Sequence, residues 1–90
     1  MAIAVYFSGG SMTTAEYDET VKALEDAGAG APDGRLHHSV MVHGNNLAVY
    51  DVWESQEKFD AFGETLMPLL QKLEIDPGQP DILPVHNLIQ

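Results

Sequence analysis

The chain has 90 residues, enough for one domain over residues 1–90 with a modest hydrophobic core. Its 14 acidic and 4 basic side chains give a net charge of −10, which argues against nucleic acid and anionic membranes as partners, because both require Lys or Arg to neutralise phosphate. It contains no cysteine, so neither a disulfide nor a cysteine-ligated metal site is predicted.

Residues 2–7, with sequence AIAVYF, predict a first strand that is apolar on both faces and therefore central in its sheet. The same run is too short and lacks the basic flank for a signal peptide, and no apolar stretch is long enough to span a bilayer. We therefore expect a cytoplasmic protein. Gly9 and Gly10 follow the strand without the glycine spacing of a phosphate-binding loop, so a plain turn is the better interpretation.

The next segment predicts an amphipathic helix. Thr13 and Glu16 have the spacing of a capping box, and Gly28 supplies a C-terminal cap. Apolar residues recur between them at helical spacing: Tyr17, Val21, Leu24 and Ala27. The acidic side chains fall mostly on the other face, which we interpret as a solvated surface rather than a metal site.

A β-hairpin is predicted from strands over residues 35–43 and 47–54, joined through Gly44, Asn45 and Asn46. With a two-residue loop, even positions of the first strand share a face with odd positions of the second. One face then carries Leu36, His38, Val40, Val42, Leu47, Val49, Asp51 and Trp53. The other carries Arg35, His37, Ser39, Met41, His43, Ala48, Tyr50, Val52 and Glu54.

This parity gathers His38, Asp51 and Trp53 in aliphatic surroundings, with His38 opposite Asp51 or Trp53 depending on which residues form the turn. A carboxylate beside a histidine can fix the imidazole tautomer and prepare a general base. The alternative is a structural pair inside a sheet. A three-residue loop or a bulge would reverse the parity and separate the cluster. Trp53 itself is either a core residue or a surface on which a flat ligand stacks.

We expect no metal or other cofactor. His37 and His43 stand roughly 20 Å apart along one strand, too far to share an ion. Neither a Ser–His–Asp nor a Cys–His nucleophile pattern is evident.

Ser55 is predicted to cap a second helix, with a kink or a break before Pro68. The apolar stripe of this helix comprises Phe59, Phe62, Leu66, Leu69, Leu70 and Leu73. A turn over residues 76–80 leads to a last strand over 82–89, which Pro84 places at a sheet edge or a bulge. His86 and Asn87, late in that strand, could line the mouth of a cavity or contact a symmetry mate.

The element order is β-α-β-β-α-β. Two right-handed crossovers sharing one sheet predict an α+β, ferredoxin-like fold, with a four-stranded antiparallel sheet and both helices on one face. The strands are apolar on both sides, so the other face also needs a cover. A second copy of the chain is the simplest cover, and a homodimer is therefore expected.

Residues 49–55, VYDVWES, with Phe59, Phe62, Leu66 and Pro68, resemble the strand-to-helix signature of antibiotic biosynthesis monooxygenase-like (ABM) domains of the dimeric α/β-barrel superfamily. More narrowly, His38, residues 51–55 and residues 84–87 are similar to small ABM proteins without an assigned reaction. The resemblance implies a homodimer whose two sheets form one barrel, with a cavity in each subunit between sheet and helices.

Relatives implied by the resemblance include cofactor-free monooxygenases of aromatic polyketides, haem-degrading oxygenases, muconolactone-type isomerases and polyketide cyclases. The haem-degrading branch carries a tryptophan and a histidine on the second helix, where this chain has Phe62 and approximately Lys72. The cyclase branch also uses a histidine there, but this chain has none between His43 and His86. Neither mechanism transfers.

Two hypotheses follow. In the first, the protein is a cofactor-independent monooxygenase-like enzyme acting on a flat aromatic or polyketide-like substrate. His38, oriented by Asp51, would take a proton, and His86 would bind or polarise an oxygen. The candidate substrate-binding residues are Trp53, Phe59, Phe62 and Asn87. In the second, the protein is a non-catalytic dimeric ligand-binding or structural protein, and the same residues are packing and hydrogen-bonding groups.

Overall fold

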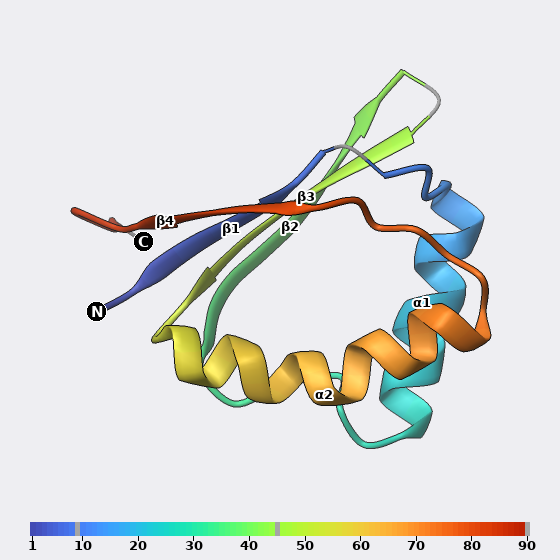
Figure 1. The fold of residues 1–90 in the computed structure, drawn as a ribbon, viewed down its shortest axis with the longest axis horizontal. Helices are drawn as coiled ribbons and strands as arrows, with labels where there is room; N and C mark the ends of the chain where they lie inside the picture. Colours follow the sequence, from blue (N-terminus) through green and yellow to red (C-terminus); the bar gives the residue numbers. More distant parts are fainter. Residues whose placement is uncertain (9, 45, 90) are drawn as a thin grey trace.

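The computed structural model describes residues 1–8, 10–44 and 46–89. Gly9 and Asn45, on which the predicted first turn and hairpin loop partly rest, lie outside the described residues. The chain forms six elements: β1 (Ile3–Phe7), α1 (Thr14–Asp26), β2 (Arg35–His43), β3 (Asn46–Trp53), α2 (Gln56–Lys72) and β4 (Pro80–Pro84). Their order matches the predicted β-α-β-β-α-β sequence (Figure 1).

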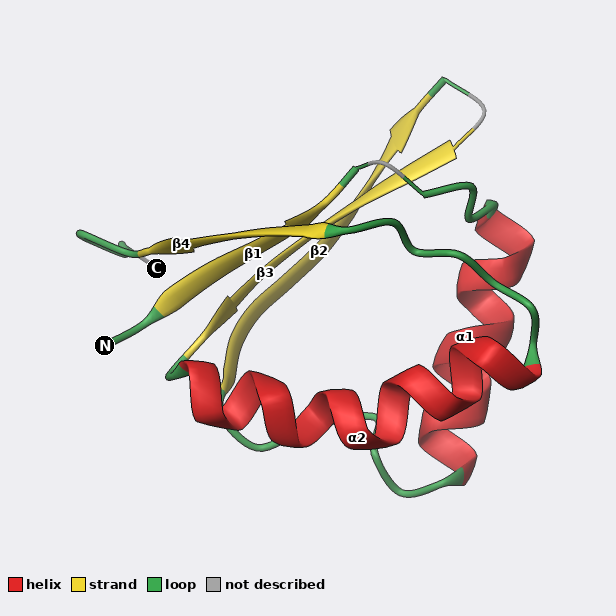
Figure 2. Ribbon diagram, viewed as in Figure 1, coloured by secondary structure: helices red, strands yellow, loops and turns green. Residues whose placement is uncertain are grey.

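The four strands form one sheet in the order β2-β3-β1-β4, and every neighbouring pair is antiparallel. Both helices lie on the same face of this sheet, as Figure 2 shows. The predicted ferredoxin-like fold is confirmed. β1 is internal, as its apolar character on both faces predicts, and β2 and β4 are the edges.

Local signals fix the ends of α1. The Thr13 hydroxyl accepts from the Glu16 backbone N–H at 3.2 Å, and the Glu16 carboxylate accepts from the Thr13 backbone N–H at 2.9 Å, which completes the capping box. At the other end Gly28 has φ +77°, and the Ala29 N–H donates to the Leu24 carbonyl at 2.8 Å. This is the Schellman arrangement, which favours glycine after the last helical turn.

Helix α2 begins at its predicted cap, where Ser55 Oγ accepts from the Lys58 N–H at 3.2 Å. The predicted break before Pro68 is wrong, because the helix runs unbroken to Lys72. Figure 1 shows its second half inclined to its first, in keeping with the kink that a missing N–H allows. Beyond the proline, Leu70 is 2% exposed and packs in the core, so tertiary packing holds the last turns.

The last strand is shorter than predicted and starts earlier. β4 pairs with β1 from Pro80 opposite Phe7 to Pro84 opposite Ile3, and residues 85–89 are not strand. The ladder ends because β1 begins at Ile3, with one further backbone hydrogen bond from the Val85 N–H to the Ala2 carbonyl at 2.9 Å. The edge position inferred from Pro84 is confirmed.

The hairpin register follows the predicted parity over most of its length. His43 pairs with Asn46, and His38 lies directly opposite Asp51. A β-bulge between Arg35 and His37 then places Arg35 opposite Trp53. The predicted face is therefore wrong for the two residues at the start of β2: Arg35 turns to the helix side, and Leu36 is 43% exposed.

Two apolar clusters pack between the sheet and the helices. One consists of Ile3, Val5 and Trp53, with Phe7, Phe59 and Phe62 packed against them. The other consists of Met12, Leu47, Leu70 and Ile75, with Tyr17, Val40, Leu66 and Leu73 packed against them. Among the described residues, no helix combines the length and apolar character needed to cross a membrane.

Candidate functional site

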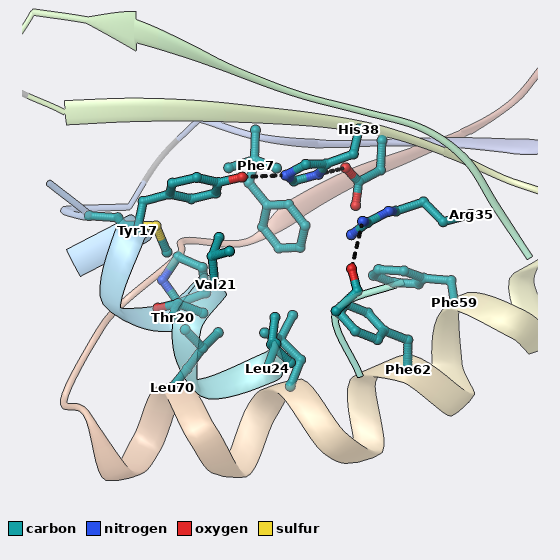
Figure 3. A pocket seen from close by; sticks show the side chains of 16 residues that line it. Phe7, Tyr17, Thr20, Val21, Leu24, Arg35, His38, Phe59, Phe62 and Leu70 are labelled. Atoms are coloured by element: carbon teal, nitrogen blue, oxygen red, sulfur yellow. Dashed lines mark hydrogen bonds and ion pairs between the residues drawn. The ribbon is translucent and has the colours of Figure 1, made fainter. Parts of the chain in front are cut away.

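A cavity of about 300 Å³ lies between the sheet and the two helices (Figure 3). This volume is at the lower end of the range for small-molecule sites. Members of both apolar clusters line it, together with a few polar side chains. The lining residues are Phe7, Met12, Tyr17, Thr20, Val21, Leu24, Gly30, Arg35, His38, Val49, Asp51, Phe59, Phe62, Leu66, Leu70 and Pro77.

One wall of the cavity carries a row of hydrogen-bonded side chains. The Tyr17 hydroxyl oxygen lies 2.7 Å from His38 Nε2, and His38 Nδ1 lies 2.5 Å from Asp51 Oδ1. Asp51 Oδ2 accepts a hydrogen bond from Trp53 Nε1 at 3.3 Å. The four side chains therefore form a continuous chain from the buried indole to the Tyr17 phenol.

The backbone places each member of the row. His38 and Asp51 are opposite each other in the β2–β3 ladder, and Trp53 lies two residues along β3 on the same face as Asp51. Tyr17 comes from the first turn of α1, which the capping box fixes. Its ring is nearly parallel to that of His38 and meets it end to end through the hydroxyl, with 6.0 Å between centroids and 13° between planes.

The hydrogen bonds along this row of side chains fix the tautomer of His38. Trp53 Nε1 can only donate, and Asp51, which is 5% exposed, accepts from it and from His38 Nδ1–H as a carboxylate. In neutral His38 the proton then sits on Nδ1, leaving the Nε2 lone pair to accept from the Tyr17 hydroxyl. Nε2 is then the imidazole nitrogen at which neutral His38 can accept a proton.

The ionisation of Tyr17 yields a pH prediction. Burial raises the pKa of the Tyr17 phenol above its ordinary 10.0; the Arg35 charge opposes the rise, and Asp51 and Asp18 add to it. Above pH 10 the native state therefore binds more protons than the unfolded state, so stability falls as the pH rises toward the folded pKa. We expect Tyr17→Phe to remove this decline.

Urea unfolding of both proteins at about pH 9 and about pH 11 measures the effect. The quantity to compare is the change in unfolding free energy between the two pH values, because Tyr17→Phe also removes a partner of His38. An equal decline in wild type and variant would contradict the prediction.

The sequence-predicted site residues divide into three groups. His38, Asp51, Phe59 and Phe62 line the cavity together. Trp53 is fully buried behind the lining, with its ring centroid 5.6 Å from that of Phe59 and 5.3 Å from that of Phe62. The functional roles of all these residues remain predictions.

The other two candidates, His86 and Asn87, lie beyond β4. Both are exposed, and neither is among the described residues that line the cavity. Their suggested roles at a cavity mouth or a symmetry contact remain predictions.

Among the lining residues that the sequence does not predict as site residues, Tyr17 and Arg35 carry ionisable side chains. Tyr17 was assigned only to the apolar stripe of α1, and its helical spacing could not reveal that it meets His38. Arg35 was assigned to the opposite face, and only the bulge brings it to the cavity. Among the described residues, no group of three or more His, Asp or Glu side chains is arranged to hold a metal ion.

No protein-family model matches the chain, and no curated protein matches its sequence. Solved structures match over almost its whole length. A Chloroflexus aurantiacus protein, described provisionally as an antibiotic biosynthesis monooxygenase, has a TM-score of 0.61 at 15% identity, covering 98% of this chain and 97% of that one. SnoaB from Streptomyces nogalater, a cofactor-independent oxygenase, has a TM-score of 0.59 at 16% identity, with 98% and 93% covered.

A conserved protein from Methanosarcina mazei is also similar, with a TM-score of 0.55 at 18% identity over 92% of this chain and 89% of that one. The chain therefore has the fold of ABM-like domains, and the resemblance seen in residues 49–68 is confirmed at the level of structure. Identities this low establish the fold and leave the reaction to be argued from the site.

Proposed function

We propose that the cavity binds a flat, largely apolar aromatic molecule and that His38 removes an acidic proton from it, which starts an oxygenation without a cofactor. The observation that carries the proposal is the Tyr17–His38–Asp51 row along one wall of an otherwise apolar cavity. A base held in one tautomer, facing a small-molecule cavity, is the arrangement that proton abstraction requires.

The chemistry proceeds from the anion. Removing a proton from a ring methylene conjugated with a carbonyl gives an electron-rich anion, which can transfer electrons to dioxygen directly. One oxygen atom then becomes a new ring carbonyl, the other leaves as water with the two methylene hydrogens, and the four-electron balance closes on dioxygen as the only oxidant. The fold likeness to SnoaB, a cofactor-independent oxygenase, supports this reaction class.

Oxygen uptake tests the proposal. Wild type with anthrone, a three-ring ketone with an acidic methylene, should consume dioxygen above the background rate and release the corresponding quinone. His38→Gln should lower that rate about a hundredfold, the usual scale for losing a general base. The matched control is His37→Gln, since His37 is exposed on the other face of the same strand. An unchanged rate in a folded His38→Gln variant would refute the base assignment.

A second candidate function is ligand binding without turnover. It is favoured by the complete mutual satisfaction of His38, Asp51 and Trp53, which a structural network also displays. Thermal-shift screening with aromatic polyketides, quinones and haem separates the two functions. Ligands that raise the melting temperature while no dioxygen is consumed favour the binding protein.

We also propose that the chain forms a homodimer through the sheet face that the helices leave uncovered. Leu83 pairs with Ala4 on that face and is 63% exposed, with Met41 and Tyr6 at 40% and 38%. Light scattering should give twice the chain mass at micromolar concentration, and Leu83→Asp should give the monomer mass. Met67→Asp, at an exposed position of α2, is the control and should leave the mass unchanged. A monomeric wild type would refute the dimer.

A further inference from the structure

Arg35 carries an inference about the ligand, which rests on the proposed function and deepens it. We infer that the guanidinium of Arg35 binds an anionic oxygen on the ligand, so that the preferred ligand is an aromatic acid rather than a neutral aromatic. Its carboxylate lies on Arg35 and its ring reaches the Tyr17–His38 wall.

The backbone turns Arg35 toward the cavity at the β-bulge. In a regular ladder Arg35 would share a face with His37, away from the helices, but the extra residue in β2 places Arg35 opposite Trp53. β-bulges commonly re-aim a side chain beside a functional site. Figure 3 shows the Arg35 side chain reaching into the cavity from the strand, beside Phe59 and Phe62.

The charge of Arg35 is available to a ligand. Within residues 1–8, 10–44 and 46–89, no carboxylate is ion-paired with Arg35, and the one hydrogen bond of its guanidinium is a long one, 3.4 Å to the Gly30 carbonyl. The carboxylate that shares the cavity, Asp51, is engaged at both oxygens by His38 and Trp53. Most of the five N–H donors of the guanidinium therefore remain free. Their planar arrangement allows two of them to bind the two oxygens of a carboxylate.

The negative net charge of the chain makes the position of Arg35 in the cavity relevant to ligand choice. The chain has only 4 basic residues against 14 acidic ones, so its general field repels anions. Among the described residues that line the cavity, Arg35 is the only Lys or Arg. Its charge also acts on the Tyr17–His38 wall, since it opposes the rise in the pKa of Tyr17. An anionic ligand held there would sit within reach of the base.

Calorimetric titration with three naphthalene probes tests the inference: hydroxynaphthoate, its neutral methyl ester, and naphthol. We expect wild type to bind the acid about tenfold more tightly than the ester, the scale of one charge-assisted contact at a partly exposed site. Arg35→Gln should abolish this preference while naphthol binding stays the same. Arg35→Lys should retain part of it, because the charge stays and the fork is lost. The control is Lys72→Gln, which changes the net charge equally at an exposed position of α2 and should keep the full preference.

The outcomes separate this inference from the proposed function. If naphthol binds but wild type shows no preference for the acid, or if Arg35→Gln keeps the preference, the inference fails and the cavity remains a binding site. If none of the probes binds wild type, both fail. If the preference disappears in Lys72→Gln as well, it reflects net charge rather than Arg35, and the inference fails.

Discussion

Replacing Trp53 with alanine is expected to lower the free energy of unfolding by about 3–5 kcal/mol, the usual cost of deleting a large core aromatic. Trp53 is 0% exposed and packs against Ile3, Val5, Phe59 and Phe62. A domain of this length has a total stability of about 5–13 kcal/mol, so this loss is a large fraction of the free energy of unfolding. Urea unfolding followed by circular dichroism measures the change without relying on the indole signal.

Two further variants separate the contribution of the Trp53 hydrogen bond from that of its ring and provide a control at an exposed site. Trp53→Phe keeps a ring but loses the N–H bonded to Asp51, and should cost about 1–2 kcal/mol. Met67→Ala, at an exposed position of α2, should stay within about 0.5 kcal/mol of wild type. Because Trp53 does not line the cavity, Trp53→Phe should also bind aromatic probes as wild type does. A Trp53→Ala cost below about 1 kcal/mol, or lost binding in a folded Trp53→Phe, would contradict a purely structural tryptophan.

Much of the fold could be predicted because its signals are local. The Thr13 capping box, Gly28 at positive φ and the Ser55 cap act within one helical turn, so their residue spacing is enough. The hydrophobic period then assigns strand or helix to each segment. Given six elements in that order, the right-handed crossover rule leaves few arrangements for the sheet.

The errors arose where distant contacts decide. The apolar stripe continues past Pro68 to Leu70, but its spacing does not reveal whether packing of that residue in the core is enough to keep α2 continuous. The end of β4 is set by where β1 begins, more than seventy-five residues earlier in the chain. Residues 35–37, which form the bulge at the start of β2, include no glycine or proline that would mark it. Each depends on tertiary structure that residue spacing does not encode.

The candidate site was predictable to the same extent. Hairpin parity places His38 on the face of Asp51 and Trp53 and leaves open which of the two it opposes. The shared face is confirmed because the bulge lies before His38 rather than after it, and the pairing is with Asp51. Tyr17 was beyond reach, since its meeting with His38 requires knowing how α1 crosses the sheet. Hence the pair within one hairpin could be predicted, but the partner from another layer could not.

Asp51→Asn is the second large effect that we expect, and it acts through the tautomer of His38. The amide offers one acceptor and one donor where the carboxylate offers two acceptors. Trp53 Nε1 can only donate, so the amide oxygen must face it, and the amide nitrogen then faces His38 Nδ1. All groups are satisfied only if the imidazole proton moves to Nε2, from which it donates to the Tyr17 hydroxyl.

That switch removes the base while leaving the shape of the site. We expect nitrogen-15 NMR to show His38 protonated on Nδ1 in wild type and on Nε2 in Asp51→Asn. In the same variant we expect anthrone oxidation to fall by about a hundredfold to a thousandfold. The control is Asp60→Asn, at an exposed position of α2, which should change neither tautomer nor rate. Because the tautomer is read without substrate, an unswitched His38 in Asp51→Asn would overturn the hydrogen-bond argument, whereas a switched His38 with an undiminished rate would show that Nε2 is not the base.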